Sequence, residues 1–211
     1  MTTQTFVRDL FQTAYEGRYT WDNNFPGYSA DVKVVYDLGV CTGKISIQPD
    51  FCVEVSEVAN EDVKLGIYTQ LQDLITHRKQ QNFEEVHGKH EFVLGETDNT
   101  GAVEIFLKSD SMDSQYKIRD RKIYQVSRVM GRKAFVINTH ASLDTGSGYL
   151  TTRYDAIERN TQTSEVECVI EFEDTYEKFG NYYIMTKQVV QEEKDGDRTV
   201  TEFNYLNIEL L

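Results

Sequence analysis

EVECVIEFED, residues 165–174, is the stretch that indicates the fold most clearly. Its apolar side chains alternate with glutamates, and a period of two is typical of a strand with one buried and one solvated face. GYSADVKVVYD at 27–37 has the same alternation. About twelve strands are predicted in this way, the others at 40–48, 51–57, 90–96, 102–108, 115–119, 122–130, 133–142, 148–158, 182–193 and 198–211.

Two segments have the helical period instead, at 4–15 and 61–80. Asn60 is a predicted N-cap for the second, whose apolar stripe is Val63, Ile67, Leu71, Leu74 and Ile75. No helix-length segment separates the later strands, so they pair antiparallel. We therefore predict an α+β, mostly β fold, in one domain spanning residues 1–211. A strongly curved antiparallel sheet, an open half-barrel, would wrap around the long helix and carry an N-terminal helix.

Composition narrows the function classes. The 211 residues include 22 Lys and Arg against 35 Asp and Glu, a net charge of −13, which disfavours nucleic acid because phosphate binding depends on basic residues. No segment has the ~18 apolar residues of a membrane span, and we expect the first residues, which are interrupted by Arg and acidic residues and have no apolar core, not to act as a secretory signal. Cys41, Cys52 and Cys168 are widely spaced and odd in number. They indicate reduced thiols in a cytoplasmic compartment, stroma-like if the protein belongs to a plastid.

Polar side chains that could support catalysis gather between 138 and 155. The candidates are His140, Tyr149, Arg153 and Asp155. His140 could act as a general base, with Ser142 or Ser147 as the nucleophile. A hydrolase or lyase acting on a hydrophobic substrate is one hypothesis, and a hydrogen-bonded barrel rim is the structural alternative.

Aromatic residues gather in groups that could line a pocket for a long or flat apolar ligand. The alternative is that they pack in the core, since tyrosine is a common strand residue. The candidate ligand-binding residues are Trp21, Phe25, Tyr28, Tyr149, Tyr154 and Tyr182.

Metal and cofactor signals are sparse. His87 and His90 are the densest ligand-capable pair, but a polar turn entering a strand explains them as well. The glycines at 146 and 148 lead into a strand and not into a helix N-terminus, so they do not form a phosphate-binding loop. We predict no cofactor and no resident metal.

Five stretches resemble an uncharacterised family of unknown function typical of cyanobacteria and plastids. They are RYTWDNNFPGYSADV at 18–32, GETDNTGAVEI at 95–105, NTHASLDTGSGYLTTRYD at 138–155, EDTYEKFGNYYIMT at 173–186 and EFNYLNIELL at 202–211. FPGYSADV at 25–32 and YYIMTK at 182–187 also resemble the rhythm of lipoprotein-carrier (LolA-like) half-barrels. That resemblance implies an open barrel around a helix, with an apolar concave face that holds acyl chains.

These observations favour a non-enzymatic binding or accessory protein that holds an apolar small molecule in a curved sheet. The family resemblance implies a lipid, isoprenoid or pigment as ligand and a role related to photosynthesis. The hydrolase or lyase remains an alternative. A third hypothesis is an assembly factor or scaffold whose acidic surface docks a basic protein partner.

Overall fold

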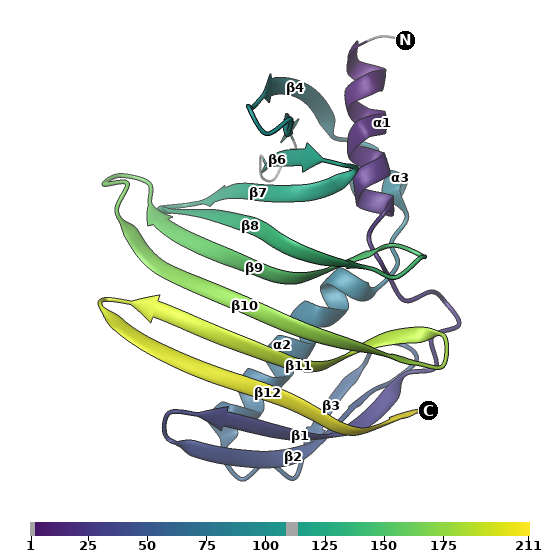
Figure 1. Ribbon diagram of the computed structural model, residues 1–211, viewed down its shortest axis with the longest axis vertical. Helices are drawn as coiled ribbons and strands as arrows, with labels where there is room; N and C mark the ends of the chain where they lie inside the picture. The colour runs from purple at the N-terminus through teal and green to yellow at the C-terminus, as the bar shows by residue number, and fades with distance from the viewer. Residues whose placement is uncertain (1–2, 109–113) are drawn as a thin grey trace. The chain divides into compact units, whose positions relative to one another are not determined.

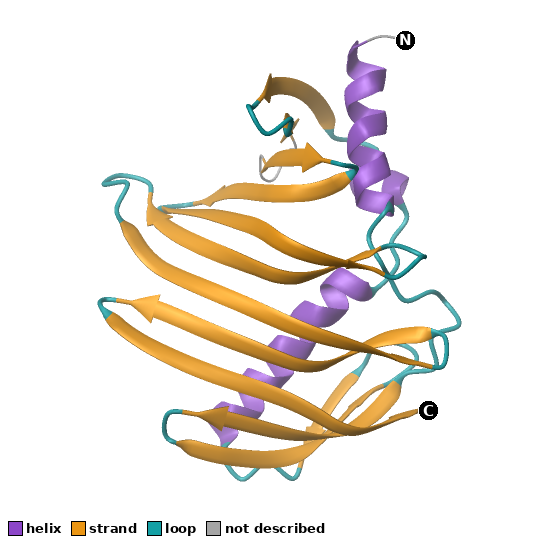
Figure 2. Ribbon diagram, viewed as in Figure 1, coloured by secondary structure: helices purple, strands orange, loops and turns teal. Residues whose placement is uncertain are grey.

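The computed structural model describes residues 3–108 and 114–211. Within them lie three helices and twelve strands (Figures 1 and 2). The helices are α1 (Thr3–Glu16), α2 (Glu61–Arg78) and α3 (Phe83–His87). The strands are β1 (Tyr28–Tyr36), β2 (Gly39–Ile47), β3 (Val53–Ser56), β4 (Glu91–Thr97), β5 (Val103–Lys108), β6 (Ser114–Arg119), β7 (Lys122–Met130), β8 (Lys133–Asp144), β9 (Tyr149–Asn160), β10 (Val166–Phe179), β11 (Tyr182–Lys194) and β12 (Asp197–Leu210).

The strands form an open, curved antiparallel sheet. Their order is β3-β2-β1-β12-β11-β10-β9-β8-β7-β6-β5-β4, so that each strand of β4–β12 lies beside its neighbour in the sequence. The predicted mostly β fold with an antiparallel sheet is confirmed. In the described part of the chain, no helix has the length and apolar character needed to cross a membrane.

The chain forms two compact units. Unit 1 contains Met1–Tyr19, Gln81–Glu171 and Glu192–Asp197, and unit 2 contains Thr20–Gln80, Phe172–Gln191 and Arg198–Leu211. Strands β10, β11 and β12 each contribute residues to both. That the whole chain is a single domain stays a prediction.

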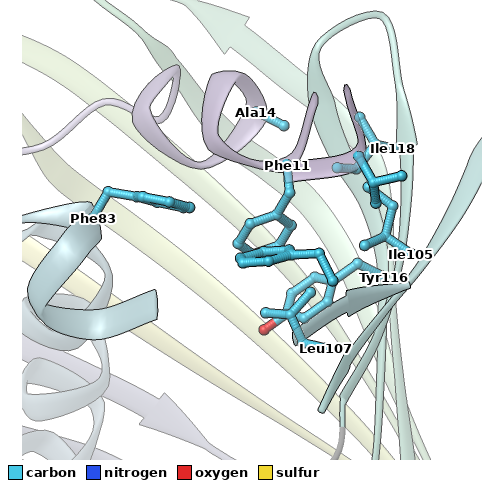
Figure 3. Packing of buried hydrophobic residues seen from close by; sticks show 9 residues of the cluster. Phe11, Ala14, Phe83, Ile105, Leu107, Tyr116 and Ile118 are labelled. Atoms are coloured by element: carbon cyan, nitrogen blue, oxygen red, sulfur yellow. The ribbon is translucent and has the colours of Figure 1, made fainter. Parts of the chain in front are cut away.

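Unit 1 has its core where α1 packs on β4, β6 and β7. The helix contributes Val7, Phe11 and Ala14, and the ring of Phe11 lies 4.9 Å from that of Tyr116 between centroids. The short helix α3 adds Phe83 to the same core. Figure 3 shows Phe11, Ala14 and Phe83 with the strand residues of this core that it labels, namely Ile105, Leu107, Tyr116 and Ile118.

Unit 2 is organised around α2. Asn60 accepts hydrogen bonds from the backbone N–H groups of Asp62 and Val63, which confirms the predicted N-cap. The helix packs on β3, and Gln70 hydrogen-bonds to Met185 of β11 and Tyr205 of β12. Apart from half-buried Val63, the predicted apolar stripe is buried, namely Ile67, Leu71, Leu74 and Ile75. The sheet strands of unit 2 therefore cover the long helix, as predicted.

Gly148 has a structural role in the GSGY stretch of unit 1. Its φ is +148°, and a Cβ at this position would lie 2.7 Å from the backbone nitrogen of Tyr19. The next residue, Tyr149, hydrogen-bonds through its backbone to Gly17 and Tyr19. Glycine is required here because the segment after α1 lies directly against the start of β9.

Candidate functional site

An open hollow lies on the sheet of unit 1. The strand residues that pack under α1, such as Leu107 and Tyr116, belong to one side of the sheet. Val93, Phe106, Gln115, Ser127 and Val136 form a cross-strand row of the opposite alternation. Because successive side chains in a strand point to opposite faces, this row lies on the face away from α1.

The hollow has a volume of about 320 Å³ and mostly apolar walls. Phe106 and Val129 in its lining are 37% and 58% exposed, so apolar surface remains accessible in it. The described lining residues on the face away from α1 are Val93, Phe106, Lys108, Gln115, Ser127, Val129, Ala134 and Val136, and those with the alternation of the α1 side are Leu107, Ser114, Arg128 and Phe135.

A chain of polar side chains crosses β7, β8 and β9. Gln125 Nε2 donates to Asn138 Oδ1 over 2.7 Å, and Asn138 Nδ2 donates to Asp155 Oδ1 over 2.8 Å. The second carboxylate oxygen, Asp155 Oδ2, lies 2.5 Å from His140 Nε2. The His140 side chain is 40% exposed and that of Asp155 is 16% exposed. The carboxylate of Asp155 therefore orients the imidazole of His140, and Asn138 in turn orients that carboxylate.

This polar chain continues the hollow along the same face of the sheet. Gln125 is two residues from Ser127 on β7, and Asn138 is two residues from Val136 on β8. The β7–β8 register is regular from Gln125 to Met130, so alternation places these four side chains on one face. The apolar walls of the hollow and this chain of hydrogen-bonded side chains therefore lie next to each other in unit 1.

The structure brings together only two of the four predicted catalytic residues, His140 and Asp155. Tyr149 is six residues from Asp155, about 20 Å along an extended strand. Its buried hydroxyl donates to the carbonyl of Ala14 and accepts from the backbone N–H of Ile123. Arg153 is exposed and in register with Ala141.

The two serines considered as nucleophiles have other partners. Ser142 Oγ accepts from Lys122 Nζ at 2.9 Å, and Ser147 Oγ lies 3.3 Å from Thr145 Oγ1. Neither bond involves His140. The arrangement expected for acyl transfer is therefore not formed by the described residues.

Of the predicted ligand-binding aromatics, three form a stack in unit 2. Trp21 and Phe25 stack with centroids 4.2 Å apart, and Tyr28 contacts both edge to face. All three are buried, and Trp21 Nε1 donates to the carbonyl of Tyr183. Tyr182 packs edge-on against Phe25 and donates its hydroxyl to Asp22.

Tyr149 and Tyr154 belong to unit 1 and lie on β9, away from the unit 2 stack in the chain. Neither is part of the described lining of the hollow. A ligand-binding role for the six predicted aromatics stays a prediction, and the described lining comes from other residues. The signal missed in the sequence is an apolar residue at solvent-face positions of several successive strands.

His87 and His90 lie together, with their Nδ1 atoms 3.1 Å apart. His87 is buried against the rings of Phe11 and Tyr15, and burial lowers its pKa to about 4. Among the described residues, no three His, Cys, Asp or Glu side chains are placed to hold a metal ion. This environment is that of a packed core histidine.

A buried polar cluster in unit 2 was not predicted. Arg78 Nη2 donates to the hydroxyl of Tyr176 over 2.8 Å, and that hydroxyl donates to Asp174 Oδ2 over 3.1 Å. Gln188 Nε2 donates to Asp174 Oδ1 over 2.8 Å. The hydroxyl of Tyr28 and Nε of Arg78 are buried and have no hydrogen-bond partner among the residues that the structure describes.

Burial raises the pKa of Asp174 to about 6, although its hydrogen bonds and Arg78 favour the charged form. Burial also raises the pKa of Tyr176 to about 12. The sequence held a signal for this site, because Asp174 follows Val166, Cys168, Ile170 and Phe172 at the same alternating position. The alternation therefore places the carboxyl group of Asp174 on the apolar face of β10.

The fold and the hollow define a mostly β protein with an open antiparallel sheet and an accessible apolar site. The chain belongs to the family described as "Protein of unknown function (DUF3386)", whose model matches residues 2–211. This confirms the resemblance to a family of unknown function, while its occurrence in cyanobacteria and plastids stays a prediction. A comparison with curated proteins found no match.

Two solved structures are similar to this chain at low identity. MucB in complex with MucA(peri) is 10% identical with a TM-score of 0.26, covering 97% of this chain and 98% of that chain. The MucA/MucB complex of Pseudomonas aeruginosa is 9% identical with a TM-score of 0.29, covering 97% and 99%.

Proposed function

We propose that this chain is a non-enzymatic binding protein that holds an apolar small molecule in the hollow of unit 1. The observation that carries the proposal is the hollow itself. Its volume of about 320 Å³ lies at the lower end of the range for small-molecule sites, roughly 300–1,000 Å³. The ligand classes that we propose are lipids, isoprenoids and pigments. The protein's role would then be related to photosynthesis.

Exposed apolar surface in the hollow supplies the driving force. Phe106 and Val129 remain partly in water although they lie side by side with other apolar lining residues. Covering such surface releases about 25 cal/mol for each Å² removed from water. An apolar ligand would gain this free energy, whereas a polar metabolite would lose hydration wherever it met the apolar walls.

The hydrolase alternative has one supporting feature, the His140–Asp155 pair. A carboxylate that orients an imidazole is part of the arrangement for general-base catalysis. Ser142 and Ser147, the two serines considered as nucleophiles, are bonded to other groups and not to His140. The binding role therefore has the stronger support.

Displacement of the fluorescent probe N-phenylnaphthylamine by apolar ligands tests the proposal. The full chain is delipidated, loaded with the probe and titrated. Val136→Glu introduces a charge into the hollow, and we expect probe affinity to fall at least about tenfold because a buried carboxylate must lose hydration.

Val166→Glu is the matched control, since Val166 is an exposed residue of β10 in the same unit and is not part of the described lining. It should bind the probe as the unmodified protein does. Equal losses in the two variants, or no probe binding by the unmodified protein, would refute the proposal. Circular dichroism of both variants establishes that they fold.

A further inference from the structure

The geometry points to an elongated apolar ligand that ends in a hydroxyl group, with the hydroxyl donating a hydrogen bond to Nδ1 of His140. This inference rests on the proposed function and adds the chemical class of the ligand. Its starting point is that the hollow and the Gln125–Asn138–Asp155–His140 chain share one sheet face.

The hydrogen bonds of Asp155 fix which nitrogen of His140 carries the proton. A carboxylate only accepts hydrogen bonds, so Nε2 of His140 is the donor toward Asp155 Oδ2. In the neutral ring the other nitrogen, Nδ1, then has a lone pair and no proton. His140 therefore presents an acceptor, which matches a ligand hydroxyl and not an ether or ester oxygen.

The spacing requires an extended ligand. His140 is four residues along β8 from Val136, and a strand rises about 3.3 Å per residue, so the two lie about 13 Å apart along the strand. The β8–β9 register shifts near His140. His140 lies there beside Asp155, four residues beyond the Val136 end of the hollow on β8. A compact ligand in the hollow would not reach the imidazole.

The charges around His140 distinguish an alcohol from an acid. The Asp155 carboxylate lies against the imidazole and repels an anionic end group. Arg153 is the nearby cation, in register with Ala141, the residue after His140. A fatty acid would depend on Arg153, whereas an alcohol would depend on His140, and the two variants therefore separate the ligand classes.

Three probes with similar alkyl chains test the inference: decanol, decyl methyl ether and decanoate. Each displaces N-phenylnaphthylamine from the full chain at alkaline pH, where histidine is neutral in general. We expect decanol to bind about tenfold more tightly than the ether, a difference of about 1.4 kcal/mol, because only the alcohol can donate a hydrogen bond to Nδ1 of His140. His140→Leu should abolish that preference, and Arg153→Leu, the matched control, should keep it.

The outcomes separate this inference from the proposed function. Equal affinities for decanol and the ether, or an alcohol preference that survives in His140→Leu, overturn the hydroxyl assignment while the hollow still binds. Tighter binding of decanoate that is lost in Arg153→Leu also overturns it and identifies an acid as the ligand. Failure of all three probes in the unmodified protein removes the proposed function itself.

Discussion

Asp174 gives unit 2 a dependence on pH that runs against the usual behaviour of carboxylates. Its pKa rises from 3.8 to about 6 because it is buried, with 8% of the residue exposed. The difference is about 2 pKa units, and each unit is worth about 1.4 kcal/mol, so the group is linked to about 3 kcal/mol of folding free energy.

The sign follows from the direction of the shift. The folded state holds the proton of Asp174 more tightly than the unfolded state does. Stability from this group is therefore fully present below pH 3.8 and is lost as pH rises through about 6. In neutral solution the buried carboxylate is charged, and the fold bears the cost of its lost hydration.

Asp174→Asn removes this titration and retains an oxygen to accept from Gln188 Nε2. We expect the free energy of unfolding of the variant, relative to the unmodified protein, to rise by about 3 kcal/mol between pH 3.8 and neutrality. Urea unfolding at a series of pH values measures it. Glu173→Gln removes the same charge from an exposed neighbour and serves as control. Curves for Asp174→Asn and the unmodified protein that stay parallel across this range would show that the reasoning is wrong.

Three other changes have defined outcomes. Burial lowers the pKa of His87 from 6.5 to about 4. The contribution of His87 to folding stability is therefore fully present above pH 6.5 and is lost as the pH falls through about 4. His87→Leu should flatten the acid limb of the unfolding free energy against pH by about 3 kcal/mol, because the buried ring must take up a proton in acid. Gly148→Ala should cost about 1–3 kcal/mol in urea unfolding, because its φ of +148° and its contact with Tyr19 leave no room for a Cβ. Asn60→Ala should cost about 1 kcal/mol, as two backbone N–H groups of α2 lose their acceptor; an unchanged Tm would contradict it.

The strands and the two longer helices were predictable because their patterns are local. Alternation at 166–172 and the stripe from Ile67 to Ile75 each repeat over several turns or residues. Helix α3 was missed because five residues do not establish a helical period, although Asn82 caps it and Phe83 anchors it. Short elements depend on tertiary contacts that no single segment of sequence encodes.

The candidate site was only partly predictable because it depends on register. His140 and Asp155 were both candidates, but their contact requires the irregular pairing of β8 with β9. Asn138 of β8 continues the chain of hydrogen bonds, and Gln125 completes it from a further strand, β7. Tyr149 lies on β9 with Asp155 but six residues away, so the length of the strand separates the two side chains.

The residues of the hollow can nevertheless be recognised in the sequence once it is known which face of the sheet α1 covers. IFL at 105–107 and AFVI at 134–137 are uninterrupted apolar runs, and such runs are typical of strands buried on both faces. Within unit 1, α1 covers the side of Ile105 and Leu107, while Phe106 and Val136 belong to the opposite face. An apolar row on a solvent-facing side weakens solubility unless something covers it. In this chain the same row lines the hollow, so the uninterrupted runs and the proposed ligand have one physical explanation.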